Sequence, residues 1–184
     1  VSEERYRVLF DLSPLPTLVF AEDTLRILAV NSAALRCYGY SHDEFLAMSM
    51  RDLRPKEEIP ILLQRLQEYG GRTIRGEALH RRKNGEALNV SGASVPLLFE
   101  GQVARLLTVE DISDRKRAEQ EIHALHTFHQ QVLDHSPIGI AVYEEAGPNL
   151  LLNPALGQII GLTPEKAHQQ NFRELRSWRE SGLL

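Results

Sequence analysis

An ordered set of sequence elements occurs twice in this chain, and this repeat constrains the fold more than any other feature. The first copy begins at Phe10 to Pro14 and the second at Leu133 to Pro137. Each copy continues with an apolar run, an acidic turn and a second apolar run, which ends in Asn31 or in Asn153. Because the order is kept over about 35 residues, one supersecondary unit has been used twice.

The first copy continues into a set of short helices. The two apolar runs of each copy are β-rich and joined by a turn, which is typical of a hairpin. Asn31 is a suitable cap for a following helix, and Ser41 with Glu44 forms the pattern of a capping box for another. Apolar residues at helical spacing predict a longer helix over Ile59 to Tyr69.

Three strands are expected after these helices. They run from Arg72 to Lys83, from Glu86 to Phe99 and from Gln102 to Asp111, with Asn-Gly and Glu-Gly turns between them. Together with the hairpin, these strands make residues 14–112 an α+β domain, with a five-stranded antiparallel sheet and helices on one face.

The remaining segments flank this domain. An N-terminal helix is expected over residues 1–13, a linker helix over 113–135, and the N-terminal half of a second, truncated domain over 136–184. The linker carries a seam of residues spaced 4, 3, 4 and 3 apart, which is typical of a coiled coil and predicts a homodimer. The alternative is a single amphipathic helix packed on its own domain. The seam consists of Ala118, Ile122, Leu125, His129 and Val132.

The chain resembles the PAS superfamily. The resemblance rests on Phe10 to Pro14, Val30 to Ala34, Tyr38 to Phe45, His80 to Gly85 and Val109 to Lys116, which follow one another at the family's spacing. The last of these is similar to the Asp-Ile-Thr-Glu-Arg-Lys segment of the C-terminal PAC part, where a PAS domain ends and a signalling helix begins.

This resemblance implies a sensory and relay module. PAS domains bind haem, flavin or small metabolites, or act only as dimerisation elements. The resemblance therefore implies an output domain in the same chain, a histidine kinase first and a diguanylate cyclase second. A ligand-free dimerisation scaffold is the alternative function, and an enzyme within this segment is the third.

No catalytic or metal site is expected in these 184 residues. No Gly-rich phosphate loop or nucleophile elbow is present, and His129 lacks the acidic neighbour of a phosphoacceptor histidine. His123 and His126 have no further ligands near them to complete a metal site. The net charge of −4 is spread evenly, which argues against nucleic acid and anionic membranes as partners. The single cysteine, Cys37, makes a cytoplasmic location the default.

The cofactor is left unknown. Met50 stands where the light-oxygen-voltage branch has its reactive cysteine, so covalent flavin-adduct photochemistry is excluded. The helix Ile59 to Tyr69 has no histidine, which argues against haem. Non-covalent flavin remains open. His80 is expected on a strand, in an exposed or half-buried structural role.

A ligand pocket is expected between the inner face of the sheet and the long helix. Gly92 and Ser94 are small where bulky residues would fill a core, which leaves room for a small molecule. The alternative is that they relieve crowding near a bend at Pro96. The candidate lining is Leu62, Leu66, Val90, Gly92, Ser94 and, as a further member, Leu107.

Two pairs of charged residues complete the expected site. The resemblance implies a structural ion pair between Glu44 and Lys83. Asp111, at the end of the last strand, is expected to cap the linker helix or to pair with Arg115, and so to transmit changes from the domain core to that helix.

Overall fold

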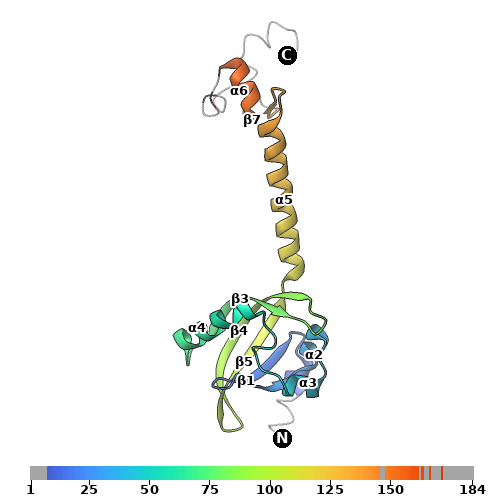
Figure 1. The fold of residues 1–184 in the computed structure, drawn as a ribbon, viewed down its shortest axis with the longest axis vertical. Coiled ribbons are helices and arrows are strands. Elements are labelled where there is room, and N and C mark those ends of the chain that lie inside the picture. Colours follow the sequence, from blue (N-terminus) through green and yellow to red (C-terminus); the bar gives the residue numbers. More distant parts are fainter. Residues whose placement is uncertain (1–7, 146–147, 162, 164–165, 167–170, 172–184) are drawn as a thin grey trace. The chain divides into compact units, whose positions relative to one another are not determined.

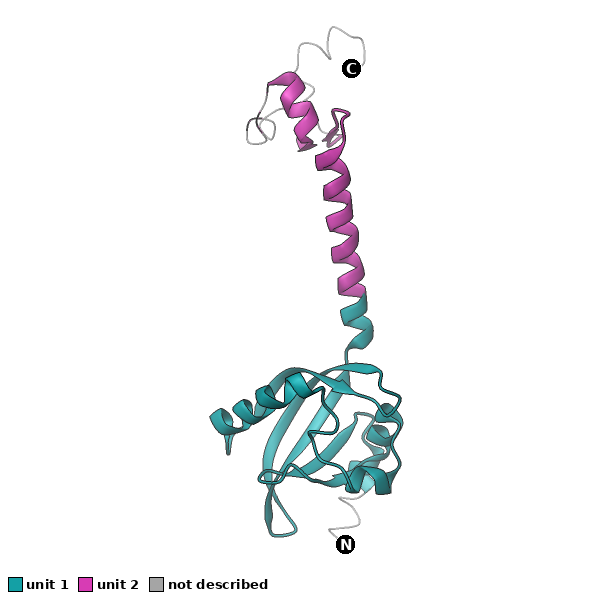
Figure 2. Ribbon diagram, in the orientation of Figure 1, with its two compact units in different colours: residues 1–117 teal, residues 118–184 magenta. Residues whose placement is uncertain are grey.

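The computed structural model describes residues 8–145, 148–161, 163, 166 and 171. The chain divides into two compact units, residues 1–117 and 118–184, which are described separately (Figure 2). Residues 8–12 are helical, which agrees with the expected N-terminal helix, and residues 1–7 of that segment lie outside the described residues.

The first unit contains the expected five-stranded antiparallel sheet (Figure 1). Its spatial order is β2-β1-β5-β4-β3, so that the last strand in sequence lies beside the first. The short hairpin and the later three-stranded meander therefore join through the pairing of β1 with β5. The strands are β1 (Thr17–Ala21), β2 (Ile27–Val30), β3 (Ile74–Arg81), β4 (Ala87–Phe99) and β5 (Gln102–Asp111).

Four helical segments lie between β2 and β3, and the three α-helices among them supply side chains to the core that covers one face of the sheet. Asn31 caps the first, where its Oδ1 accepts a hydrogen bond from Ala34 N, and Ser41 and Glu44 form the expected capping box of the second. The longest helix has the bounds that its apolar spacing predicts. The segments are α2 (Ser32–Tyr38), α3 (His42–Leu46), the 3-10 turn η1 (Lys56–Glu58) and α4 (Ile59–Tyr69).

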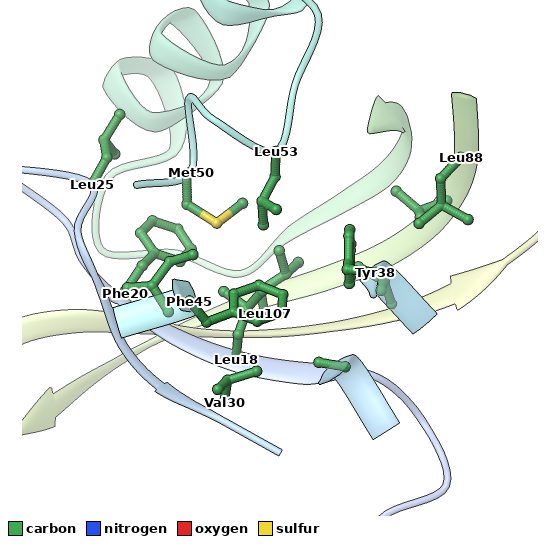
Figure 3. Packing of buried hydrophobic residues seen from close by; sticks show 14 of the residues in the cluster. Leu18, Phe20, Leu25, Val30, Tyr38, Phe45, Met50, Leu53, Leu88 and Leu107 are labelled. Carbon is green, nitrogen blue, oxygen red and sulfur yellow. The ribbon is translucent and has the colours of Figure 1, made fainter. Parts of the chain in front are cut away.

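The core of the first unit lies between these helices and the sheet (Figure 3). Tyr38 and Phe45, from α2 and α3, meet edge to face with their ring centroids 5.8 Å apart. Leu88 and Val90 on β4 are buried and alternate with the half-buried Asn89 and Ser91, as a strand with one covered face requires.

The linker helix α5 (Ser113–His135) leads from the first unit into the second. A second antiparallel hairpin follows, formed by β6 (Ala141–Tyr143) and β7 (Asn149–Leu152). Asn153 then caps α6 (Pro154–Ile160), as Asn31 caps α2. Residues 172–184, which belong to the expected second domain, lie outside the described residues. Among the described residues, no helix is long and apolar enough to cross a bilayer.

Candidate functional site

A cavity of about 50 Å³ lies between α4 and the inner face of the sheet. Its wall includes Phe20 from β1 and Met50 from the loop after α3, and α4 closes it from the other side. The six residues expected from the sequence all lie in this wall: Leu62, Leu66, Val90, Gly92, Ser94 and Leu107. In this conformation the cavity has room for one or two water molecules, whereas sites for drug-sized ligands measure about 300–1,000 Å³.

Gly92 lies where β4 approaches β5 closely. A Cβ atom at this position would lie 3.0 Å from the backbone oxygen of Thr108 and 3.0 Å from Cγ1 of Val109. Such contacts are tighter than most in packed interiors, so the neighbouring strand would have to shift slightly to accept a side chain here. The close approach at Gly92 is to the neighbouring strand β5 rather than to the bend at Pro96, while Ser94 keeps a hydroxyl in the wall of the cavity.

His80 lies in the cavity wall and is 1% exposed, so the expectation of an exposed or half-buried residue is wrong. The reason is register: His80 pairs with the inward-facing Leu88 across β3 and β4 and shares its face of the sheet. Its Nδ1 lies 2.7 Å from the hydroxyl of Tyr38. Burial, together with the nearby charge of Arg54, lowers the pKa of His80 to about 3, so the imidazole is neutral.

Arg54, in the loop before η1, is a second buried polar residue of the wall, with 8% exposure. Its nearest carboxylate is Glu58, whose Oε2 lies 3.8 Å from an Arg54 terminal nitrogen. Burial lowers the pKa of Arg54, and the charge of Glu58 opposes this. Sequence reasoning missed Arg54 because nothing local to an irregular loop signals which side chain turns inward.

Arg105 on β5 is fully buried and was also missed. Its Nε donates to Ser94 Oγ at 2.8 Å, one terminal nitrogen contacts Glu22 at 3.1 Å, and the other donates to the backbone oxygens of Ser94 and Arg72. Arg105 is therefore a paired structural residue that holds the end of the sheet, in contrast to Arg54.

At the opposite end of the domain, Lys83 contacts Glu44, as the resemblance implied. Lys83 Nζ lies 2.7 Å and 2.8 Å from the two carboxylate oxygens. These hydrogen bonds from Lys83 lower the pKa of Glu44. Both side chains are exposed by more than two fifths, so the pair links α3 to the end of β3 at the protein surface.

The junction between β5 and α5 contains Asp111. Its Oδ1 accepts a hydrogen bond from Ser113 N at 2.9 Å, which corresponds to the capping alternative. The other oxygen lies 2.6 Å from Arg82, so the ion-pair partner of Asp111 is Arg82 rather than Arg115. Arg115 lies instead 2.9 Å from Glu77 on β3. Burial by itself would raise the pKa of Asp111, but the hydrogen bonds from Ser113 and the charge of Arg82 together outweigh it, so the pKa is lowered.

The expected seam lies on α5 and is exposed. Ile122, Leu125 and Val132 keep 70%, 55% and 51% of their surface, and Ala118 and His129 are exposed as well. Among its described residues, α5 buries none of its side chains.

Comparison with known proteins shows that the chain is similar to parts of two bacterial kinases. It is 25% identical over 178 residues to sporulation kinase E of Bacillus subtilis and 30% identical over 145 residues to the sensor histidine kinase TmoS of Ectopseudomonas mendocina. The matches cover 96% and 75% of this chain but only 23% and 15% of those proteins. The chain thus spans less than a quarter of the length of these relatives.

Solved structures agree on the fold. The PAS domain of an HTR-like protein from Haloarcula marismortui superposes with a TM-score of 0.54 at 23% identity, over 60% of this chain and 92% of that one. Family models described as PAS domain match residues 14–114, which contain the five-stranded sheet, and residues 127–183. On this fold and these matches, the chain belongs to the PAS domain family.

Proposed function

We propose that this chain is a sensory and relay module, which converts a change in the cavity of the first unit into a change in α5 and passes it to an output domain in the same chain. The names of its relatives make a histidine kinase the first choice for that output, and a diguanylate cyclase the second. The single cysteine supports a cytoplasmic location for this region.

The observation that carries this proposal is a chain of contacts from the cavity to α5. Arg65 of α4 lines the cavity and donates to the backbone oxygen of Glu77 at 3.2 Å. The carboxylate of Glu77 lies 2.9 Å from Arg115 and 2.7 Å from Lys116, in the first turns of α5. A displacement of α4 would therefore reach α5 through one residue of β3.

A second connection fixes the direction in which α5 leaves the sheet. Asp111 holds the start of α5 through Ser113 N, and Arg82 holds Asp111 from the end of β3. Arg82 also donates to the backbone oxygen of Cys37 on α2. The start of α5 is thus attached to the middle of β3 through Glu77 and to the C-terminal end of β3 through Arg82, so that a change at either place would alter the geometry of the helix.

A homodimer through α5 completes the proposed relay. The exposed seam on α5 is apolar at four of its five positions, and a second copy of the same helix is the partner that heptad spacing fits. A change in the rotation of α5 would then repack the seam and reach the output domain.

The ligand-free scaffold is the second candidate, and the cavity volume of about 50 Å³ favours it. In that case the seam and the junction would act without a bound molecule. Native mass spectrometry of the purified chain distinguishes the two, because a retained small molecule appears as an added mass on the protein.

The test of the relay is Glu77→Gln in the full-length protein, with Glu57→Gln, an exposed residue of η1, as the matched control. The charge that holds Arg115 and Lys116 is lost while the shape is kept, so we expect altered output activity with an unchanged fold. Autophosphorylation and circular dichroism are measured on the same samples. Normal, signal-dependent output from a folded Glu77→Gln protein would reject the relay.

A further inference from the structure

The cavity wall presents buried hydrogen-bond donors that lack acceptors. Arg54 Nε and His80 Nε2 are inaccessible to solvent and have no hydrogen-bond partner among the described residues. Both residues line the same cavity, and both are more than nine-tenths buried. Buried polar groups are nearly always paired in folded proteins, so two unpaired groups on residues that line one cavity indicate a missing partner.

The free nitrogen of His80 is a donor rather than an acceptor. Burial raises the pKa of Tyr38, so its hydroxyl keeps the proton. That hydroxyl has one hydrogen bond among the described residues, to His80 Nδ1 at 2.7 Å, and an undonated buried proton would be costly. The hydroxyl therefore donates to Nδ1, and in a neutral imidazole the ring proton is then on Nε2.

Ser94 adds a third donor to the wall. Its Oγ accepts from Arg105 Nε at 2.8 Å, which leaves the hydroxyl proton available to a group in the cavity. Arg105 fixes the position of this hydroxyl because its terminal nitrogen also holds the backbone oxygen of Ser94.

The charge of the wall is positive. Arg54, Arg65 and Arg75 all line the cavity, and none of the described residues in the wall is a carboxylate. Glu58, at 3.8 Å from Arg54, is too distant for a hydrogen bond. The rest of the wall is apolar, with Phe20, Met50, Leu62, Leu66 and Val90 among its members.

We propose that this cavity binds a small carboxylic acid as its anion, with the carboxylate between Arg54 and His80 and a short apolar body against Leu62 and Leu66. The wall lacks hydrogen-bond acceptors and negative charge. A carboxylate supplies both and brings no further donor. This inference rests on the proposed sensory function and names the ligand class of the same cavity.

Binding requires α4 to move outward, since the present volume of about 50 Å³ is smaller than such a molecule. Leu62 is the one buried residue of this helix, so few buried side chains hold α4 in place. The same helix carries Arg65, which contacts Glu77. Entry of the ligand would therefore act directly on the contact that leads to α5.

The test uses the 184-residue chain and three probes: butanoate, its neutral analogue butanamide, and inorganic phosphate. We expect butanoate to raise the melting temperature and butanamide and phosphate to leave it unchanged. Arg54→Gln should bind butanoate at least about 10-fold more weakly, because a charge-assisted contact is lost. Arg36→Gln removes an exposed arginine on α2 and is the matched control, with binding unchanged.

Arg54→Gln also distinguishes a ligand site from a structural one. A residue kept for binding is not needed for folding, so the variant without butanoate should melt no lower than the parent chain. A lower melting temperature with unchanged butanoate binding would overturn the assignment.

Other outcomes overturn the ligand class alone. Equal binding of butanamide would remove the role of charge, and binding of phosphate alone would replace the carboxylate by another anion. If no probe binds, the inference fails. The relay is still tested separately by Glu77→Gln, which needs no knowledge of the ligand.

Discussion

Asn31 and Asn153 occupy matching positions in the two copies of the repeated unit and make matching hydrogen bonds. Asn31 Oδ1 accepts from Thr17 N and Ala34 N, both at 2.9 Å. Asn153 Oδ1 accepts from Ile140 N at 2.7 Å and from Leu156 N at 3.0 Å. Each amide nitrogen also donates at 2.9 Å to a backbone oxygen, that of Leu15 for Asn31 and that of Ile138 for Asn153.

The two copies differ in how deeply their first strands are buried. Every residue of β1 is buried, whereas β6 in the second copy has none that is fully buried among the described residues. All buried apolar residues that the structure describes belong to the first unit. The comparison shows that the hairpin, turn and cap form from local contacts, while a core requires the strands β3 to β5 and the helix α4.

The most severe test of this comparison replaces the two asparagines. Asn31→Ala removes a buried cap and several hydrogen bonds, so we expect a loss of about 3 kcal/mol in the free energy of unfolding. Asn153→Ala should change the free energy of unfolding of the first unit by less than about 0.5 kcal/mol. Hydrogen exchange of the β4 and β5 amides measures both. Equal losses would show that the copies share one core.

Val19 and Val142 are a second matched pair, in β1 and β6. Val19 is 0% exposed and Val142 is 45% exposed. Val19→Ala should cost about 2 kcal/mol through lost burial and the space left behind, and Val142→Ala less than about 0.5 kcal/mol. Urea denaturation followed by circular dichroism gives both values. A large effect at Val142 would mean that β6 is covered in solution.

His80 makes the stability of the first unit depend on pH. The described part of the second unit contains no buried ionisable side chain that could do the same. His80 stays neutral in the folded protein down to about pH 3, whereas the unfolded residue takes up a proton near pH 6.5. As the pH falls below 6.5, the unfolded state binds more protons, so stability falls by about 1 kcal/mol per pH unit. The pKa values of Glu44 and Glu77 are lowered from 4.5, so these two residues lose their contribution to stability only below pH 4.5.

The measurement is the free energy of unfolding between pH 6.5 and 4.5, for the parent chain and for His80→Gln. The variant should show a flatter slope, whatever its stability at neutral pH. His42→Gln, at an exposed histidine of α3, is the control with the parent slope. Parallel curves for His80→Gln and the parent would contradict the buried, neutral imidazole.

The smallest effect is expected at the ion pair of the first unit. Lys83→Met should leave the melting temperature within the error of the measurement, because Lys83 and Glu44 are both exposed and the pair is screened by solvent. Salt titration of the parent chain should show the same insensitivity. A marked loss of stability would mean that the pair holds α3 in place, which the exposed geometry does not suggest.

Much of the fold was predictable because its signals are short in range. The helix α4 and the strand β5 have the bounds that their residue patterns predict. The turn Glu100-Gly101 adopts positive φ at both residues, as a tight hairpin demands. The alternation along β4 was enough to place Val90, Gly92 and Ser94 in one wall.

The partners of charged residues were less predictable. Asp111 was expected to cap α5 or to pair with a residue four positions away, and the cap is present, but its ion-pair partner is Arg82, 29 residues away in the chain. Arg115 pairs with Glu77, which is 38 residues away. No local sequence pattern indicates a contact between residues so far apart in the chain. Glu77 was therefore not predicted as a contact of α5.

By itself, the sequence determined the repeat, the strands and helices of the first copy and the caps that begin them, because these depend on contacts between residues a few positions apart. Only the tertiary structure decided which polar groups are enclosed. Arg105 and Arg54 are both buried, yet Arg105 finds acceptors on three separate segments, whereas the Nε of Arg54 has none in the part of the chain that the structure describes. That difference arises when β5, α4 and the loop before η1 are brought together, and it depends on the distances among them rather than on any one segment.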